Sequence, residues 1–187
     1  MKSRENDIIY LFYNYPTKHW HYSKLKETLK ISDPKLSKWL SKLKKDNLIQ
    51  KIKEKNKMPY YIGNYSTPNY RNSKNIFALR YFHENDFLNY LGSLNAKLVI
   101  IFGSFSRGDW YFESDIDLFV YGNIDEDKIY DFSKKLNREI QLFHCENRKS
   151  FRKMSNDLIK NILLGYVVKG SLSFVEAKFD VKESRRN

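Results

Sequence analysis

The first part of the chain carries the hydrophobic periodicity of short amphipathic helices. Three stretches with this pattern are predicted to be helical: residues 6–15, 22–29 and 33–46. The third has the clearest start, because residues able to cap a helix precede Pro34 at its first helical position. Its apolar face consists of Leu36, Trp39, Leu40 and Leu43. We therefore expect Trp39 to be buried in a core.

Strand-like alternation follows these helices. Residues 48–52 alternate between apolar and polar, and residues 60–62 return after a polar turn, which predicts a β-hairpin. The stretch 63–69 is typical of a linker, and residues 70–91 predict one long helix. Three helices followed by a hairpin is the element order of a winged helix-turn-helix domain.

Buried strands alternate with helices in the second half. The pattern predicts these elements in order: a strand at 98–102, a short helix at 103–108, strands at 116–121 and 139–143 around a helix at 127–136, a helix at 151–164 and a strand at 166–168. This alternation favours an α/β unit with a small mixed sheet, so the whole chain is predicted to be α+β.

Membrane insertion and disulfide bonding find no support in the sequence. The longest apolar run, residues 98–102, has five residues, whereas a membrane-spanning helix needs about 20. Cys145 is the only cysteine, so no internal disulfide can form. A single cysteine fits a reducing compartment, and we expect a cytoplasmic protein.

Positive charge is concentrated in the first half of the chain. The net charge is +12; residues 1–90 contain 18 Lys and Arg against 8 Asp and Glu, and the remainder contains 16 against 14. This asymmetry favours two modules, of which the basic one would attract a polyanion. We expect a winged helix-turn-helix domain over 1–65, a linker and bridging helix over 66–94, and a second domain over 95–180.

The lysines of the basic module follow one helix face and the hairpin. A winged helix places its third helix in the major groove of duplex DNA and its wing against the backbone. Lysines there would contact phosphates, and serines could contact bases. The candidate DNA-binding residues are Lys35, Ser37, Lys38, Ser41, Lys42, Lys45, Lys51, Lys53, Lys55 and Lys57. A protein-docking role for this domain stays open, because lysines also cover ordinary solvated helix faces.

A glycine-serine turn and an Asp-x-Asp pair lie close together in the second half. Gly103 can adopt a positive φ where a buried strand ends, and Ser104 follows at a helix start that could bind a triphosphate. Gly108 closes that helix. Asp115 and Asp117 are two residues apart on a strand, so both face the same side. Two carboxylates in this arrangement suit Mg²⁺ or Mn²⁺.

These residues and their spacing resemble the minimal nucleotidyltransferases of the DNA polymerase β superfamily. The resemblance extends further. The order of a basic winged helix, a bridging helix and this core, together with residues 158–170 at its end, resembles archaeal-type fusions of a winged helix to such a domain. The resemblance implies a metal-dependent enzyme that transfers a nucleoside monophosphate from a nucleoside triphosphate (NTP) to a hydroxyl acceptor. It implies catalytic roles for Asp115, Asp117 and Glu139, metal binding by Asp115 and Asp117, and nucleotide binding by Gly103, Ser104, Arg107 and Gly108.

One position departs from the pattern of that superfamily, which has a third carboxylate on a later strand. The corresponding position here holds Gln141, and Glu139, two residues earlier on the same face, is the candidate replacement. Two alternatives therefore stay open. The chain could be a DNA-binding regulator whose core only senses nucleotide, or an antitoxin-type protein with a small helical protein partner. Rossmann and P-loop glycine motifs are absent from the sequence.

Overall fold

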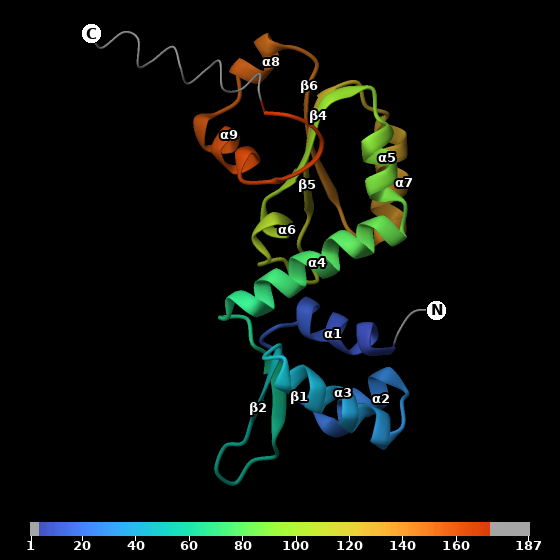
Figure 1. Cartoon of the computed structure of the whole chain (residues 1–187), viewed down its shortest axis with the longest axis vertical. Coiled ribbons are helices and arrows are strands. Elements are labelled where there is room, and N and C mark those ends of the chain that lie inside the picture. Colours follow the sequence, from blue (N-terminus) through green and yellow to red (C-terminus); the bar gives the residue numbers. More distant parts are fainter. Residues whose placement is uncertain (1–3, 173–187) are drawn as a thin grey trace, which may run out of the picture. The chain divides into compact units, whose positions relative to one another are not determined.

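The computed structural model describes residues 4–172 and divides the chain into two compact units (Figure 1). The first unit comprises Met1–Ile76 and Gly108–Glu113, and the second comprises Phe77–Arg107 and Ser114–Asn187. The first unit thus extends past the predicted boundary at residue 65 and takes in a segment from the predicted second domain. Residues 173–180 of that predicted domain lie outside the described residues.

Helices and a small sheet make up the first unit. Its elements are α1 (Arg4–Asn14), β1 (Trp20–His21), α2 (Tyr22–Leu29), α3 (Asp33–Lys45), β2 (Ile49–Ile52) and β3 (Tyr60–Gly63). The three predicted helices and the hairpin are confirmed. The short strand β1 was not predicted, because two residues cannot show alternation. Both β1 and β2 pair antiparallel with β3, which gives the sheet order β1-β3-β2.

Aromatic residues beyond the three helices complete the core of this unit. Tyr70 is buried, donates a 2.6 Å hydrogen bond from its hydroxyl to the carbonyl of Phe12, and meets the Tyr13 ring edge-on. Gly63 makes room for it, since a Cβ there would lie 2.8 Å from the Tyr70 hydroxyl. Trp110 is also buried in this unit. A fragment ending at residue 65 would lack both aromatic side chains.

The expectation that Trp39 belongs to the core is wrong. Leu36, Leu40 and Leu43 are buried, but Trp39 is only half-buried. The Nζ atoms of Lys38 and Lys42 lie 5.9 and 5.3 Å from its ring centroid. Helical spacing could not settle this position, because residue 39 lies at the border between the apolar and the basic face of α3.

Two helices that the sequence predicts as continuous are broken. The predicted helix 70–91 is α4 (Pro68–Glu84) and α5 (Phe87–Ser93), separated where Asp86 adopts a left-handed φ of +64°. Aspartate tolerates this conformation better than most residues. The predicted helix 151–164 is α8 (Arg148–Arg152) and α9 (Asn156–Leu163). Ser155 caps α9 by accepting a hydrogen bond from the amide of Leu158, a signal that the sequence does contain.

A mixed sheet forms the centre of the second unit, as predicted. Its strands are β4 (Ala96–Phe102), β5 (Ile116–Gly122), β6 (Ile140–Cys145) and β7 (Tyr166–Gly170), in the order β6-β5-β4-β7. Strands β5 and β6 are parallel and the other pairs are antiparallel. Within this unit, α5 and α7 (Glu126–Leu136) lie on one side of the sheet and α8 and α9 on the other (Figure 1).

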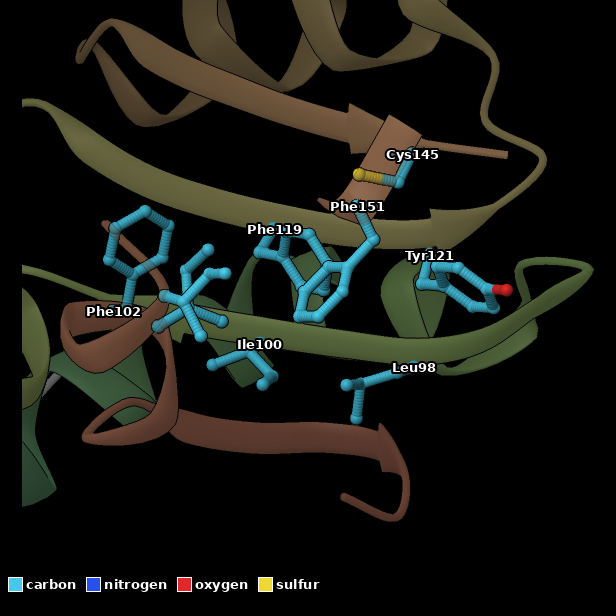
Figure 2. Packing of buried hydrophobic residues seen from close by; sticks show 9 residues of the cluster. Leu98, Ile100, Phe102, Phe119, Tyr121, Cys145 and Phe151 are labelled. Atoms are coloured by element: carbon cyan, nitrogen blue, oxygen red, sulfur yellow. The ribbon is translucent and has the colours of Figure 1, made fainter. Parts of the chain in front are cut away.

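The sheet face toward α8 and α9 carries the main apolar cluster of this unit (Figure 2). Leu98, Ile100 and Phe102 reach it from alternate positions of β4. On β5, Phe119 and Tyr121 point to the same face, and the ring of Phe119 lies 6.0 Å from that of Phe151 of α8. Alternation along β5 puts Asp117 on this face too, at the end of a strand fixed by buried neighbours. No helix within residues 4–172 is long and apolar enough to span a bilayer.

Candidate active site

The turn after β4 lies against the carboxylate of Asp117. Phe102 is the register partner of Asp117, and Gly103 follows with a φ of +67°. A Cβ built on Gly103 would overlap Oδ2 of Asp117. Only glycine allows both this conformation and this close approach. The backbone N–H of Ser104, the first residue of α6 (Ser104–Arg107), hydrogen-bonds the same carboxylate.

The surroundings of Asp117 oppose its negative charge more than they stabilise it. Burial raises the pKa of the Asp117 carboxyl above its usual value of 3.8, and the neighbouring carboxylate of Asp115 raises it further. The guanidinium of Arg107 and the Ser104 amide offset part of this rise. Asp115 is exposed immediately before β5. The two carboxylates lie close enough for Asp115 to raise the pKa of Asp117, and a divalent cation would relieve this repulsion.

Arg138 is a site residue that the sequence interpretation missed. Its Nη1 donates a 2.9 Å hydrogen bond to the carbonyl of Ser114, the residue just before Asp115. Its guanidinium also lies 5.3 Å from the ring centroid of Phe105 in α6. Arg138 therefore links the approach to the aspartate pair with the helix that follows Gly103. An arginine ahead of a predicted strand gives no sequence signal for this role.

The position of a third acid is occupied by a neutral side chain. Gln141 of β6 is the parallel register partner of Asp117, and Ile140 is that of Ile116. Glu139 precedes β6, is exposed, and accepts a hydrogen bond at its carbonyl from the amide of Ile116. Among residues 4–172 no group of three or more His, Cys, Asp or Glu side chains is arranged to hold a metal ion. Within the described residues, Asp115 and Asp117 thus come close together without a third side chain that could bind metal.

The turn predicted to bind nucleotide is tightly organised. Gly103 and Gly108 both have positive φ and flank α6. The carbonyl of Gly103 accepts hydrogen bonds from the amide of Arg107, at 3.2 Å, and from the hydroxyl of Ser106, at 2.9 Å. The side chain of Arg107 is exposed. The Ser104 amide is hydrogen-bonded to Asp117, and the charge of Arg107 also acts on that carboxylate.

The predicted DNA-binding residues are all exposed on the first unit. They are Lys35, Ser37, Lys38, Ser41, Lys42 and Lys45 of α3, and Lys51, Lys53, Lys55 and Lys57 of the hairpin. Two of the lysines form ion pairs, Lys42 with Glu5 and Lys57 with Glu54, both at 2.5 Å. Since exposed pairs of this kind are weak, they would compete little with a polyanion.

The comparisons with known proteins identify the family. The sequence model of the nucleotidyltransferase domain matches residues 85–186, which is more than half of the chain. The chain therefore belongs to the nucleotidyltransferase domain family, and the glycine turn with the aspartate pair lies inside the matched region.

A curated relative and two solved structures are similar to parts of the chain. A Methanocaldococcus jannaschii protein, named as a candidate protein adenylyltransferase, is 48% identical over 40 residues, which are 21% of this chain and 40% of that protein. Crystal structures of two variants of the toxin–antitoxin MntA-HpeT cover 60% and 58% of this chain and 92% and 89% of theirs, at 15% and 18% identity. Their TM-scores are 0.36 and 0.31, below the level that indicates a shared fold.

We predict that Asp117→Asn stabilises the fold at neutral pH. A carboxyl whose pKa is raised in the folded state lowers the free energy of unfolding wherever the unfolded chain ionises that carboxyl. This cost is absent below about pH 3.8 and grows as the pH rises toward the folded-state pKa. The variant should therefore have the higher Tm at pH 7, and its advantage should shrink toward pH 4. Thermal unfolding across this range measures both.

The exposed aspartate of α7 provides the matched control for this prediction. Asp131→Asn makes the same change in net charge at an exposed position, and it should leave the pH dependence of the Tm unchanged. An Asp117→Asn variant less stable than wild type at pH 7 would contradict the electrostatic account of the site.

Proposed function

We propose that the chain is a metal-dependent nucleotidyltransferase that moves a nucleoside monophosphate from an NTP to a hydroxyl acceptor. The observation that carries this proposal is the carboxylate of Asp117, packed against the backbone of Gly103 beside a second carboxylate. An electrostatically costly pair at the end of a rigid strand suits a cation site better than a structural role. Membership of the nucleotidyltransferase family supports the reaction class.

Each residue of the site has a role in this reaction. Asp115 and Asp117 would hold divalent ions, which when bound would polarise the acceptor hydroxyl and stabilise departing pyrophosphate. The acceptor oxygen bonds to the α-phosphorus as the bond from that phosphorus to the pyrophosphate oxygen breaks. Arg107 contacts the triphosphate, and Arg138 keeps the backbone before Asp115 in place through Ser114. Glu139 is proposed to accept the acceptor's proton.

A protein hydroxyl is the acceptor that the name of the M. jannaschii relative favours. The M. jannaschii protein is named for transfer of adenylyl groups to protein, and it shares 48% identity with this chain over 40 residues. On this basis ATP is the proposed donor. Incubation of the chain with Mg²⁺ and each labelled NTP, in the presence of cell extract, tests donor and acceptor together.

A second candidate function rests on Gln141. Its amide takes the place beside Asp117 where the superfamily pattern has a carboxylate. A core that binds metal and nucleotide without efficient transfer would serve a DNA-binding regulator or an antitoxin-type protein. The two candidates share the nucleotide site and differ only in turnover.

We predict that Glu139→Gln separates these candidates. If Glu139 takes the proton, the variant should lose on the order of 10²-fold in turnover, the range typical of a lost general base. Its affinity for Mg²⁺–ATP should change little. Single-turnover transfer to a labelled acceptor, with calorimetric binding in parallel, measures both quantities.

An isosteric replacement at position 141 gives a matched comparison. Gln141→Glu places a carboxylate next to Asp117 and, if the third acid is missing from wild type, should raise turnover. Normal turnover in Glu139→Gln would remove Glu139 from the mechanism, and zero transfer by wild type would favour the nucleotide-sensing candidate.

For the first unit we propose a winged helix-turn-helix that binds duplex DNA. The short turn from Lys30 to Ser32 joins α2 to α3, and Lys30 ends α2 in a left-handed conformation. Strand β1 pairs with β3 of the β2–β3 hairpin, an arrangement typical of a wing. Helix α3 buries one face and exposes a row of lysines on the other. Together these features support major-groove docking of α3.

We predict a strong salt dependence of DNA binding by the full chain. If about four to six lysines meet phosphates, counterion release at about −0.9 per contact gives a slope of log K against log salt of about −4 to −5. Replacing Lys38, Lys42 and Lys45 with Ala should weaken binding to all duplexes and flatten the slope by up to about 3. Anisotropy titrations at several salt concentrations provide the slope.

Lysines of the second unit supply the control. Replacing Lys128, Lys134 and Lys149 with Ala removes the same net charge from exposed positions and should leave the slope nearly unchanged. Equal effects of both triple replacements would mean that only net charge matters, and a slope near zero for wild type would leave the first unit as a protein-docking module.

A further inference from the structure

The segment between the two halves of the catalytic motif is built into the first unit. Gly108–Glu113 belongs to that unit, although Arg107 before it and Ser114 after it belong to the second. Trp110, near the middle of the segment, is 2% exposed. A loop that merely joined a turn to a strand would have no reason to bury a tryptophan.

A buried lysine contacts this tryptophan through its ammonium group. Lys74 of α4 is 2% exposed, and its Nζ donates a hydrogen bond to the carbonyl of Trp110. The same Nζ lies 4.5 Å from the centroid of the Trp110 ring and 5.6 Å from that of Tyr70. Burying a lysine is costly unless its charge is stabilised, and the carbonyl and the two rings provide that stabilisation. The contact therefore fixes both the backbone and the side chain of Trp110.

Both flanks of Trp110 are held as well. The amide of Phe112 donates a 3.0 Å hydrogen bond to the carbonyl of Asn14, and the Phe112 ring stacks on Tyr15 at 5.3 Å. At the other flank the backbone of Gly108, with a φ of +75°, passes close to that of Arg71, because a Cβ on Gly108 would lie 2.9 Å from the carbonyl oxygen of Arg71. Residues of the first unit thus contact the middle and the end of the segment and lie close to its start.

Covalent connection carries this immobilisation into the catalytic motif. Gly108 continues directly from α6, whose Ser104 amide holds Asp117. Glu113 continues directly into Ser114 and then Asp115, whose approach Arg138 also fixes. The segment is therefore covalently continuous with both halves of the motif.

We propose that Trp110 is a positioning residue for the nucleotidyl-transfer site, and that duplex DNA bound to the first unit changes the affinity for Mg²⁺–ATP through Gly108–Glu113. This inference rests on the proposed function for its ligands, but the mechanical link rests on the contacts of Gly108–Glu113 within the first unit. Coupling between two binding sites is reciprocal, so Mg²⁺–ATP must change DNA affinity by the same factor.

Hydrogen exchange of the full-length chain tests the mechanical link. Trp110→Leu should speed exchange of the Ser104 amide and of the amides of residues 105–107 and 114–117. Leu25→Ala is the control, because Leu25 is fully buried in α2 of the same unit but makes none of the contacts described for the segment. Compared at equal distance below their Tm values, the control should leave these amides as in wild type.

Calorimetric titration with Mg²⁺–ATP, with and without a DNA duplex, tests the coupling. Trp110→Leu should weaken Mg²⁺–ATP binding about tenfold, which is within the range typical of coupled sites. The same variant should abolish the effect of DNA on Mg²⁺–ATP binding. Lys74→Met removes the contact to the Trp110 carbonyl at similar volume and should give the same result in milder form. It replaces Trp110→Leu in the experiment if Trp110→Leu does not fold.

The two proposals fail in different ways. Exchange of the Ser104 amide that is the same in the Trp110 or Lys74 variant as in Leu25→Ala would overturn the positioning role. Unchanged exchange on addition of DNA, together with an unchanged Mg²⁺–ATP affinity, would overturn the coupling. Absence of Mg²⁺–ATP binding by wild type would instead refute the proposed function, while the exchange experiment would still decide the role of Trp110.

Discussion

The close approach of the Asp117 carboxylate to the backbone of Gly103 is the constraint on which the second unit depends. It requires a glycine with positive φ at the end of β4, a register that sets Phe102 beside Asp117, and a short helix whose first amide reaches the carboxylate. The apolar cluster around Phe119 supports that register from the sheet face toward α8 and α9. Core packing thus sets the position of a charged group that contributes nothing to the core.

The raised pKa of Asp117 indicates that its carboxylate serves a function and does not stabilise the fold. Burial and the proximity of Asp115 raise the pKa of Asp117, and only Arg107 and one backbone amide offset the effect. A residue that weakens the fold in this way is expected where charge serves binding or catalysis. The neutral Gln141 beside it limits the negative charge of the site. The proposed reaction therefore assigns proton acceptance to Glu139.

Local patterns predicted most elements of this chain, and tertiary contacts account for what they missed. The helices, the hairpin and the mixed sheet follow from hydrophobic periodicity, and Gly103, Asp115 and Asp117 follow from a spacing specific to one superfamily. The break at Asp86 left no trace, because the apolar pattern continues across it. The burial of Trp110 and the link from Arg138 to Ser114 depend on residues distant in sequence. No single-segment pattern could have predicted either.

The central claim is that the aspartate pair binds a divalent cation together with a nucleotide. Calorimetric titration with ATP, with Mg²⁺ and without it, tests this claim most directly in wild type and in the Asp115→Asn, Asp117→Asn double variant. The account predicts metal-dependent binding by wild type, and no metal-dependent binding by a variant that remains folded. Binding that is equal with and without Mg²⁺, or equal in the two proteins, would contradict it.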